Sequence, residues 1–487
     1  MERISKPYLA ESLADFAFET DYKDLPGEVV RRVKIFILDI IGTALAGSMS
    51  TLAKEETKRV LEKGGRPEST IIGHQKKTIA EWAGHLNHFH SEFFDWTPDY
   101  LQLGHPSALT IPPILAAAER EGVDGKTFIA SAAAGYEIEC RLLQSRYSQF
   151  MRPEHLEEGA GNVGGAAGVA KEMRLSKEKI AHAIAHAAYV ESGTLWEAVK
   201  YHGGGGIKVL SSTNDVEIAE YAKMGVTLPL QIFEGKLGYF EIRAKRYGGK
   251  PFDADRVRKD LGKEWKMLLA AYKPYPNTCN PMQGQVEAAL DLIKEGRIRP
   301  QDVDKVFVKI SAAGQNYSFA KPIKYKPETW IMCNFSTPYL VGVSILKGRL
   351  TPAEFTDEVR TDPKVLEMVA KVDGVEDEEF STQWLKDMSR IPIEVTIWTK
   401  DGKKHVKFLD IPKGEPHCPK YSGDINKWYK AIEDKFRGIV SNIPGYAENV
   451  DEIVNTTMNL EKLDDIKKLT RLLQKDTPTR YRIDKGR

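Results

Sequence analysis

The chain has 487 residues, more than one hydrophobic core usually accommodates, so we expect roughly two to four domains. Its 70 Lys and Arg residues balance 69 Asp and Glu residues, and a net charge of +1 argues against nucleic-acid or anionic-membrane partners. The four cysteines form no CxxC pair, which argues against a disulfide framework or zinc ribbon and favours a reducing, cytoplasmic environment.

The first ten residues lack the apolar stretch and the cleavage site of a secretory signal, so we expect no export. The most apolar stretch, residues 35–47, contains Asp39 and falls short of the ~20 residues that span a bilayer. We therefore expect no membrane segment.

The first half of the chain has the pattern of packed helices. From residue 29 onward, apolar residues recur at steps of three and four, which predicts a buried helix face. Small residues favour further closely packed helices, around residues 111–120, 126–140, 163–173, 177–189 and 216–224. Residues 1–268 are therefore predicted to be mostly α-helical.

The pattern changes at Lys273-Pro274-Tyr275-Pro276, because each proline removes a donor and restrains its neighbour. Beyond it, alternation predicts a strand at residues 306–310 and a hairpin formed by residues 391–397 and 404–409. Helical spacing returns at residues 425–475. The predicted fold is mainly α: a helical domain of residues 1–268 plus 413–487, with an inserted α+β domain of residues 269–412.

The first functional signal is His105 followed by Pro106, in a loop that also contains Asp95. The proline disfavours helical geometry at His105, which suits a side chain presented at a helix N-terminus and able to move protons near neutral pH. The alternative is that His88 and His90 are ordinary surface or interface histidines and that Asp95 is a helix cap.

A second signal is the glycine-rich segment of residues 159–164, which formally contains GxGxxG. A dinucleotide fingerprint needs a strand directly before it, whereas residues 149–158 are charged and do not alternate. We favour another interpretation, in which the glycines begin the next helix and let it approach a neighbour or an anion closely. His155 would then lie just outside the N-terminus of that helix.

Two further signals are weaker. Lys208 follows a run of four glycines, but the chain has neither a GxSxG elbow nor a P-loop order, and the alternative is a mobile loop that happens to carry a lysine. His182 and His186 are spaced for one helix face, yet the HExxH glutamate is absent, which favours packing over zinc binding.

In their order along the chain, these features resemble the MmgE/PrpD family. The likeness runs through nearly the whole chain, and its markers are residues 38–42, 95–106, 155–164, 208, 232–240, 272–276 and 411–414. The resemblance implies a helical domain built from both chain ends, a smaller α/β domain and a homodimer. It also implies a cofactor-free lyase that acts on a small di- or tricarboxylic acid. The favoured activity is that of a dehydratase, and the alternative is a decarboxylase or an epimerase.

The resemblance carries over site residues as well. It implies a catalytic set of His105, His155, Lys208 and Tyr317, of which Tyr317 is a looser match, and substrate binding by Asp95, Thr97 and Lys208. Within this set His105 would be the acid or base with His155 as its partner, while cationic Lys208 would attract the carboxylate. The chain departs from the family pattern at Phe93, Trp96, Ser211, Asn334 and near Met282 or Gln283, positions that meet substrate.

These inferences lead to three expectations and two alternatives. We expect His105, His155 and Lys208 to converge on one cleft between the domains, and we expect no metal and no organic cofactor. The partners would be a small carboxylic acid and a second copy of the chain, with no nucleic acid and no membrane. The alternatives from other classes are a NAD-dependent dehydrogenase, which needs a strand before Gly159, and a non-catalytic interaction protein that lacks convergent histidines.

Overall fold

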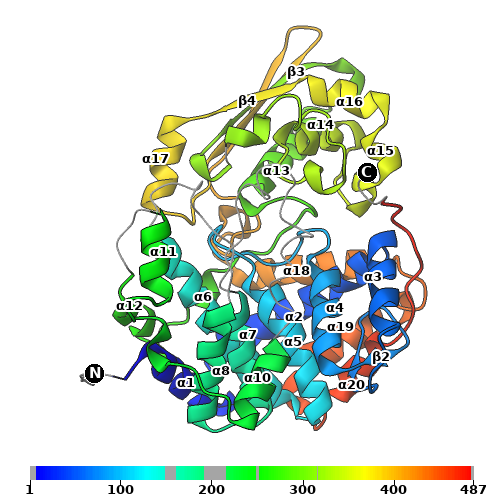
Figure 1. Cartoon of the computed structure of the whole chain (residues 1–487). Helices are drawn as coiled ribbons and strands as arrows, with labels where there is room; N and C mark the ends of the chain where they lie inside the picture. Colours follow the sequence, from blue (N-terminus) through cyan, green and yellow to red (C-terminus); the bar gives the residue numbers. More distant parts are fainter. Residues whose placement is uncertain (1–6, 148–160, 191–214, 248–251, 315, 484–487) are drawn as a thin grey trace.

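The computed structural model describes residues 7–147, 161–190, 215–247, 252–314 and 316–483. Figure 1 shows two regions: a large body of helices below, and above it a twisted sheet accompanied by shorter helices. The predicted fold class, mainly α with a smaller α+β part, is confirmed.

The first half of the chain forms the large helical body. Its elements are α1 (Leu9–Glu19), α2 (Gly27–Ser48), α3 (Thr51–Leu61), β1 (Ser69–Thr70), β2 (Lys77–Thr78), α4 (Ala80–Glu92), α5 (Pro106–Glu121), α6 (Gly125–Tyr147), α7 (Gly161–Glu172), α8 (Lys177–Val190), α10 (Asp215–Met224), α11 (Tyr239–Tyr247) and α12 (Ala254–Arg258). The helices predicted from spacing in this half are all present. Because α2 is buried on nearly every side, it forms the centre of the body.

Glycines bring α6 and α7 into backbone contact. A Cβ atom at Gly135 would lie 2.6 Å from the Gly164 carbonyl oxygen, and one at Gly164 would overlap the Gly135 carbonyl oxygen. Only glycine leaves room for this approach, which confirms the prediction that the glycine-led helix packs closely on a neighbour.

The second half of the chain forms the sheet and its helices. The strands are β3 (Val303–Ile310), β4 (Val372–Glu376), β5 (Ile393–Thr399) and β6 (Lys404–Leu409), in the order β4-β3-β5-β6. The accompanying helices are α13 (Asn280–Glu295), α14 (Thr337–Lys347), α15 (Asp357–Arg360), α16 (Pro363–Ala370) and α17 (Glu378–Lys386). β3 pairs in parallel with β4 and antiparallel with β5, which in turn forms the predicted hairpin with β6.

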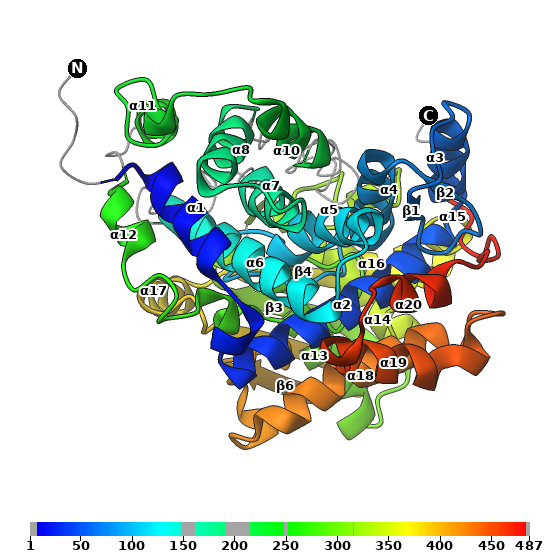
Figure 2. The same cartoon turned by 90° about the horizontal axis from the view of Figure 1, so that it is seen from below.

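The last helices return to the helical body. They are α18 (Ile425–Val440), α19 (Val450–Met458) and α20 (Lys467–Thr470), and Figure 2 shows α18 and α19 beside α2. α18 buries Trp428, Ile432 and Phe436 on one face, and a Cβ atom at Gly42 of α2 would lie 2.9 Å from the Phe436 ring. The domain limits at residues 268/269 and 412/413 stay a prediction.

None of the helices in the described residues combines the length and the apolar composition needed to cross a bilayer.

Candidate active site

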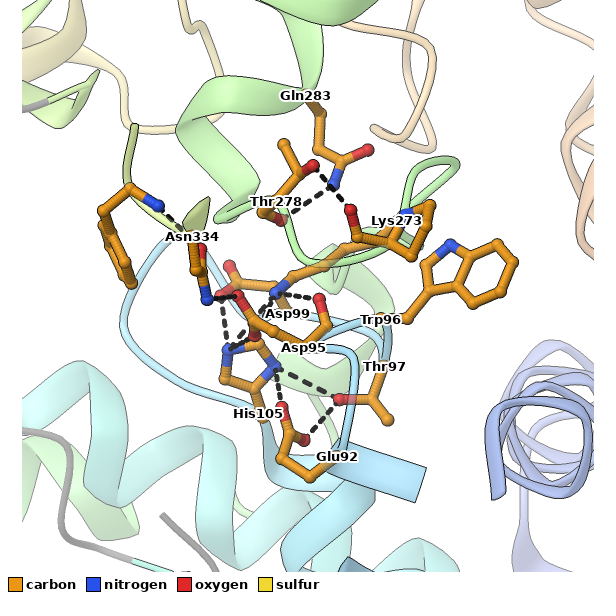
Figure 3. Close-up of polar contacts among 12 residues, drawn as sticks. Glu92, Asp95, Trp96, Thr97, Asp99, His105, Lys273, Thr278, Gln283 and Asn334 are labelled. Atoms are coloured by element: carbon orange, nitrogen blue, oxygen red, sulfur yellow. Dashed lines mark hydrogen bonds and ion pairs between the residues drawn. The ribbon is translucent and has the colours of Figure 1, made fainter. Parts of the chain in front are cut away.

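The candidate active site is built on the loop that joins α4 to α5 (Figure 3). His105 is the N-cap of α5, with φ −114° and ψ 65°, and Pro106 is the first residue of the helix. This confirms that the proline holds His105 at the end of a loop. The loop also passes through the left-handed region at Asp95, where φ is 43°, a conformation that residues with a Cβ atom rarely adopt.

The Nδ1 atom of His105 faces Thr97 and Glu92. It lies 3.2 Å from Thr97 Oγ1 and 3.5 Å from Glu92 Oε1, and all three side chains are buried. The Thr97 hydroxyl donates to Glu92 Oε2 at 2.7 Å, so the Thr97 oxygen can accept a hydrogen bond from the imidazole. These contacts favour the tautomer that carries its proton on Nδ1.

The Nε2 atom of His105 faces one ammonium group and two carboxylates. Lys273 Nζ lies 3.4 Å away, Asp95 Oδ1 3.3 Å and Asp99 Oδ2 3.8 Å. A neutral imidazole can accept from Lys273 at this atom, whereas a protonated imidazole can donate from it to Asp95. His105 can therefore gain or lose a proton at Nε2 without changing its place in the network.

Sequence reasoning missed three residues of this network: Glu92, Asp99 and above all Lys273. The Lys273 side chain is fully buried, and its ammonium donates to Asp95 Oδ1 at 2.7 Å and to the Asp95 carbonyl at 3.1 Å. The sequence points to this residue only as part of a proline-rich domain boundary and of the family marker 272–276, with no role in the site. Lys273 directly precedes Pro274, just as His105 directly precedes Pro106. A polar residue before a proline is therefore the sequence feature that could have identified it.

Backbone hydrogen bonds bring Lys273 to the loop. Asp99 and Ala271 exchange N–H···O bonds of 2.8 and 2.9 Å, and Asn277 donates its N–H to the Phe94 carbonyl. The segment that carries Lys273 is thus paired to the loop on both sides of the lysine, which fixes the direction of its side chain.

Asn334, from the segment before α14, completes the set of groups around Asp95. Its Nδ2 donates to Asp95 Oδ2 at 2.9 Å, while its Oδ1 accepts from the Phe335 N–H at 2.9 Å, so the amide orientation is determined. The Asn334 carbonyl lies 3.5 Å from the ammonium of Lys324, and burial lowers the pKa of Lys324 to about 8. Both oxygens of Asp95 are therefore held by groups from the second half of the chain.

The structure brings together three of the residues predicted for the site: His105, Asp95 and Thr97 lie within one buried network (Figure 3). Asp95 does not act as a simple helix cap, because its carboxylate binds Lys273 and Asn334 instead.

The other predicted site residues are not placed. His155, Lys208 and Ser211 lie outside the described residues, and Tyr317 lies in the short helix Asn316–Phe319 with its side chain outside the description. The convergence of His105, His155 and Lys208 on one cleft therefore stays a prediction.

Two departures from the family pattern have packing roles here. The ring of Phe93 stacks on Trp330 with centroids 4.5 Å apart, which places an apolar layer next to the site. Gln283 accepts from the Tyr275 N–H and donates to the Tyr275 carbonyl, each at 2.9 Å, and so braces the segment that carries Lys273.

The remaining histidines of interest are structural. The interpretation of His88 and His90 as surface residues is wrong, because each is 1% exposed. Burial lowers the pKa of His90 to about 3, so it packs in the neutral form. On α8, His182 Nδ1 lies 3.1 Å from the Leu228 carbonyl and the His186 ring lies 5.6 Å from the Tyr221 ring, in agreement with packing.

Within the described residues, Glu92, Asp95 and His105 are the one group with the spacing to hold a metal ion, since their ligand atoms lie within 4.8 Å of one another. The Lys273 ammonium already contacts this group, at 2.7 Å from Asp95 Oδ1. A fixed cation there disfavours a second one by repulsion and takes up ligand oxygens.

We therefore expect the purified protein to contain no stoichiometric metal and to keep its activity after treatment with a chelator. Elemental analysis of the chelated and untreated protein, paired with activity assays, checks this. One zinc or iron per chain, with activity lost on removal and restored on addition, would show that the group binds a metal.

Comparisons with known proteins agree with one another. Residues 11–248 match the model described as the MmgE/PrpD N-terminal domain, and residues 277–460 match the MmgE/PrpD C-terminal domain. The chain is similar to a cis-aconitate decarboxylase-like protein of Aspergillus oryzae, at 22% identity over 95% of this chain and 96% of that protein. It is also similar to cis-aconitate decarboxylase of Aspergillus terreus, at 24% identity over 92% of each chain. A shorter match, 35% identical over 13% of this chain and 12% of the relative, is to mitochondrial 2-methylcitrate dehydratase of Yarrowia lipolytica.

Proposed function

Because the chain belongs to the MmgE/PrpD family, we propose that it is a lyase acting beside a carboxylate of a small di- or tricarboxylic acid. Its relatives include enzymes named as decarboxylases and as a dehydratase, and both reactions are lyase reactions. Both need a group that gives or takes a proton at a carbon, together with stabilisation of negative charge next to a carboxylate.

The observation that carries this proposal is that His105 Nε2 faces both a donor, the Lys273 ammonium, and an acceptor, the Asp95 carboxylate. Lys273 at 3.4 Å suits the neutral imidazole, and Asp95 at 3.3 Å suits the protonated one. A general acid or base must exist in both forms within one geometry, because reorganisation between them would add to the barrier. The buried surroundings strengthen each electrostatic contact.

In dehydration, His105 would take the proton from the carbon beside the carboxylate. The electron pair of that C–H bond forms the double bond, and the hydroxyl leaves as water with a proton from an acid such as the Lys273 ammonium. The developing negative charge would lie near that ammonium, which is fixed before the reaction begins.

Decarboxylation is the second candidate, and the length of the matches favours it. The relatives cited that match over more than nine tenths of this chain are named as a cis-aconitate decarboxylase and a cis-aconitate decarboxylase-like protein, whereas the dehydratase matches over 65 residues. In this reaction the bond to the carboxylate carbon breaks, carbon dioxide leaves, and the electron pair on the remaining carbon takes a proton from protonated His105 or from Lys273.

The remaining parts of the proposal come from the family resemblance. His155 would be the proton-transfer partner of His105, Lys208 would bind the substrate carboxylate, and Tyr317 would contribute from the second half of the chain. We also propose that the enzyme needs no cofactor and acts as a cytoplasmic homodimer.

A panel of di- and tricarboxylic acids, incubated with the purified protein in deuterium oxide and followed by proton NMR, tests the proposal. We expect one acid to show enzyme-dependent change: alkene formation with loss of water, loss of a carbon, or exchange of the proton beside the carboxylate together with appearance of the other epimer. These outcomes identify a dehydratase, a decarboxylase and an epimerase, respectively.

Heat-denatured protein is the control for the spontaneous reaction. If no acid reacts, and oxidation or reduction of a nicotinamide cofactor is observed with a small hydroxy acid instead, the lyase proposal is wrong and the dehydrogenase alternative stands.

A further inference from the structure

Lys435, on α18, contacts the loop of residues 93–105 that joins α4 to α5, which we call the site loop. Its ammonium donates to the Trp96 carbonyl at 2.7 Å and pairs with Asp39 of α2, at 2.8 Å from Oδ1 and 3.1 Å from Oδ2. Both charged side chains are buried, with 5% of Lys435 and 1% of Asp39 exposed. The same ammonium lies 4.9 Å from the centre of the Trp96 ring.

Stability alone does not account for this ion pair. Burial raises the pKa of Asp39 and lowers the pKa of Lys435, so the surroundings disfavour both charges and the pair only partly offsets that cost. Buried ion pairs can often be replaced by apolar residues of similar size without loss of stability. α2 and α18 are also joined by apolar packing, as at Gly42 and Phe436, and by contacts of Arg31 and Arg32 with the start of α18. The two helices therefore do not depend on this pair alone.

What the pair adds is a donor for the loop backbone. Trp96 lies between Asp95 and Thr97, whose side chains both contact His105. The Asp95 carbonyl accepts from Lys273 at 3.1 Å, and the next carbonyl, that of Trp96, accepts from Lys435. Two consecutive peptide groups are thus each held by a buried ammonium, where the backbone is in the rarely populated left-handed region.

We propose that Lys435 is a positioning residue for the site: through the Trp96 carbonyl it fixes the peptide that sets Asp95 and Thr97 against His105. Asp39 has the role of keeping Lys435 charged and directed at the loop. The effect on turnover rests on the proposed function, whereas the effect on the loop itself does not.

The alternative is that the pair only fastens α18 to α2. A matched control exists in the chain, because Lys34 of α2 makes the same kind of contact to the end of α19. Its ammonium donates to Glu461 Oε2 at 3.0 Å and to the Met458 carbonyl at 2.7 Å. These partners lie outside the site loop, so removing this pair weakens a different contact between α2 and the last part of the chain and leaves the loop contacts in place.

The test compares two neutral double variants, Asp39→Asn/Lys435→Met and Asp39→Asn/Lys435→Gln, with the control Lys34→Met/Glu461→Gln. Methionine and glutamine have the same length, but only glutamine can donate to the Trp96 carbonyl. The measurements are kcat and KM, together with hydrogen–deuterium exchange of peptides that cover residues 93–105.

We expect the methionine variant to lose about 10- to 100-fold in kcat, with KM changed by less than about threefold, since misplacement of a catalytic group affects turnover first. Its loop peptides should exchange faster. The glutamine variant should recover most of the loop protection and at least about fivefold in kcat, and the control should match the wild type in both readouts.

Equal behaviour of the methionine and glutamine variants, or the same losses in the control, would overturn the proposal. Exchange needs no substrate, so it decides the positioning role even if no acid proves to be a substrate, an outcome that counts against the proposed function alone. If the methionine variant does not fold, the glutamine variant is compared with the control. A loop that exchanges faster than in the control, with kcat lowered as well, supports the proposal, whereas a loop as protected as in the control, or a loosened loop with unchanged kcat, refutes it.

Discussion

We expect the His105→Gln enzyme to turn over its substrate about 10²- to 10⁴-fold more slowly than the wild type. Glutamine places its amide near the position of the imidazole Nε2 and can keep a hydrogen bond to Asp95 Oδ1, which lies 3.3 Å from that atom. It cannot gain or release a proton near neutral pH, so the acid–base step loses its group while the loop keeps its shape. The measurement is kcat and kcat/KM for the acid identified by NMR.

A control separates this effect from a loss of folding. His90 is equally buried and bonds Thr57 and the Ile72 carbonyl away from the site, so His90→Gln should retain turnover in the fraction that folds. If His105→Gln retains full activity, the assignment of His105 as the acid or base is wrong, even though the family membership remains.

The second large effect is expected for Lys273→Met. Removing one partner of a buried ion pair leaves a charge without its counterion, which typically costs about 3–5 kcal/mol of folding free energy. Lys273 is fully buried and 2.7 Å from Asp95 Oδ1, so the free energy of unfolding should fall by about that amount. Turnover should fall at least about 10²-fold, because the ammonium next to the developing charge is also lost.

The double variant Lys273→Met/Asp95→Asn isolates the two parts of this prediction. It removes the uncompensated carboxylate, so most of the lost stability should return while turnover stays low. Urea unfolding and kinetics on the wild type and these two variants measure this. If the double variant is no more stable than Lys273→Met, the Lys273–Asp95 pair is not the source of the stability change.

The fold could be predicted largely because its signals are local. The apolar spacing from residue 29 onward predicted α2, and the alternation in residues 391–397 with its partner run 404–409 predicted the hairpin of β5 and β6. β4 was missed because Asp373 and Gly374 interrupt the apolar alternation of a short edge strand. Its pairing with β3 is parallel and comes from contacts distant in sequence, which no local pattern contains.

The site follows the same rule. Asp95, Thr97 and His105 lie within one short loop, so their order along the chain was enough to group them. Lys273 and Asn334 meet the loop from 168 and 239 positions beyond His105 and Asp95, respectively, and only folding brings them there. Neither Lys273 before a proline nor Asn334 between the apolar residues Cys333 and Phe335 shows by itself which side chain it will contact.

The position of Lys435 also sets an order in time for the synthesis of an active enzyme. It follows Trp96 by 339 positions, so at about 5–20 residues per second the ribosome adds it roughly 20 to 70 s after the loop. During that interval the face of α2 that receives α18 is without its cover, and Asp39 is without its counterion. The nascent chain therefore carries an uncovered apolar surface and an unanchored site loop until its last helices emerge, and we expect it to bind chaperones during that interval.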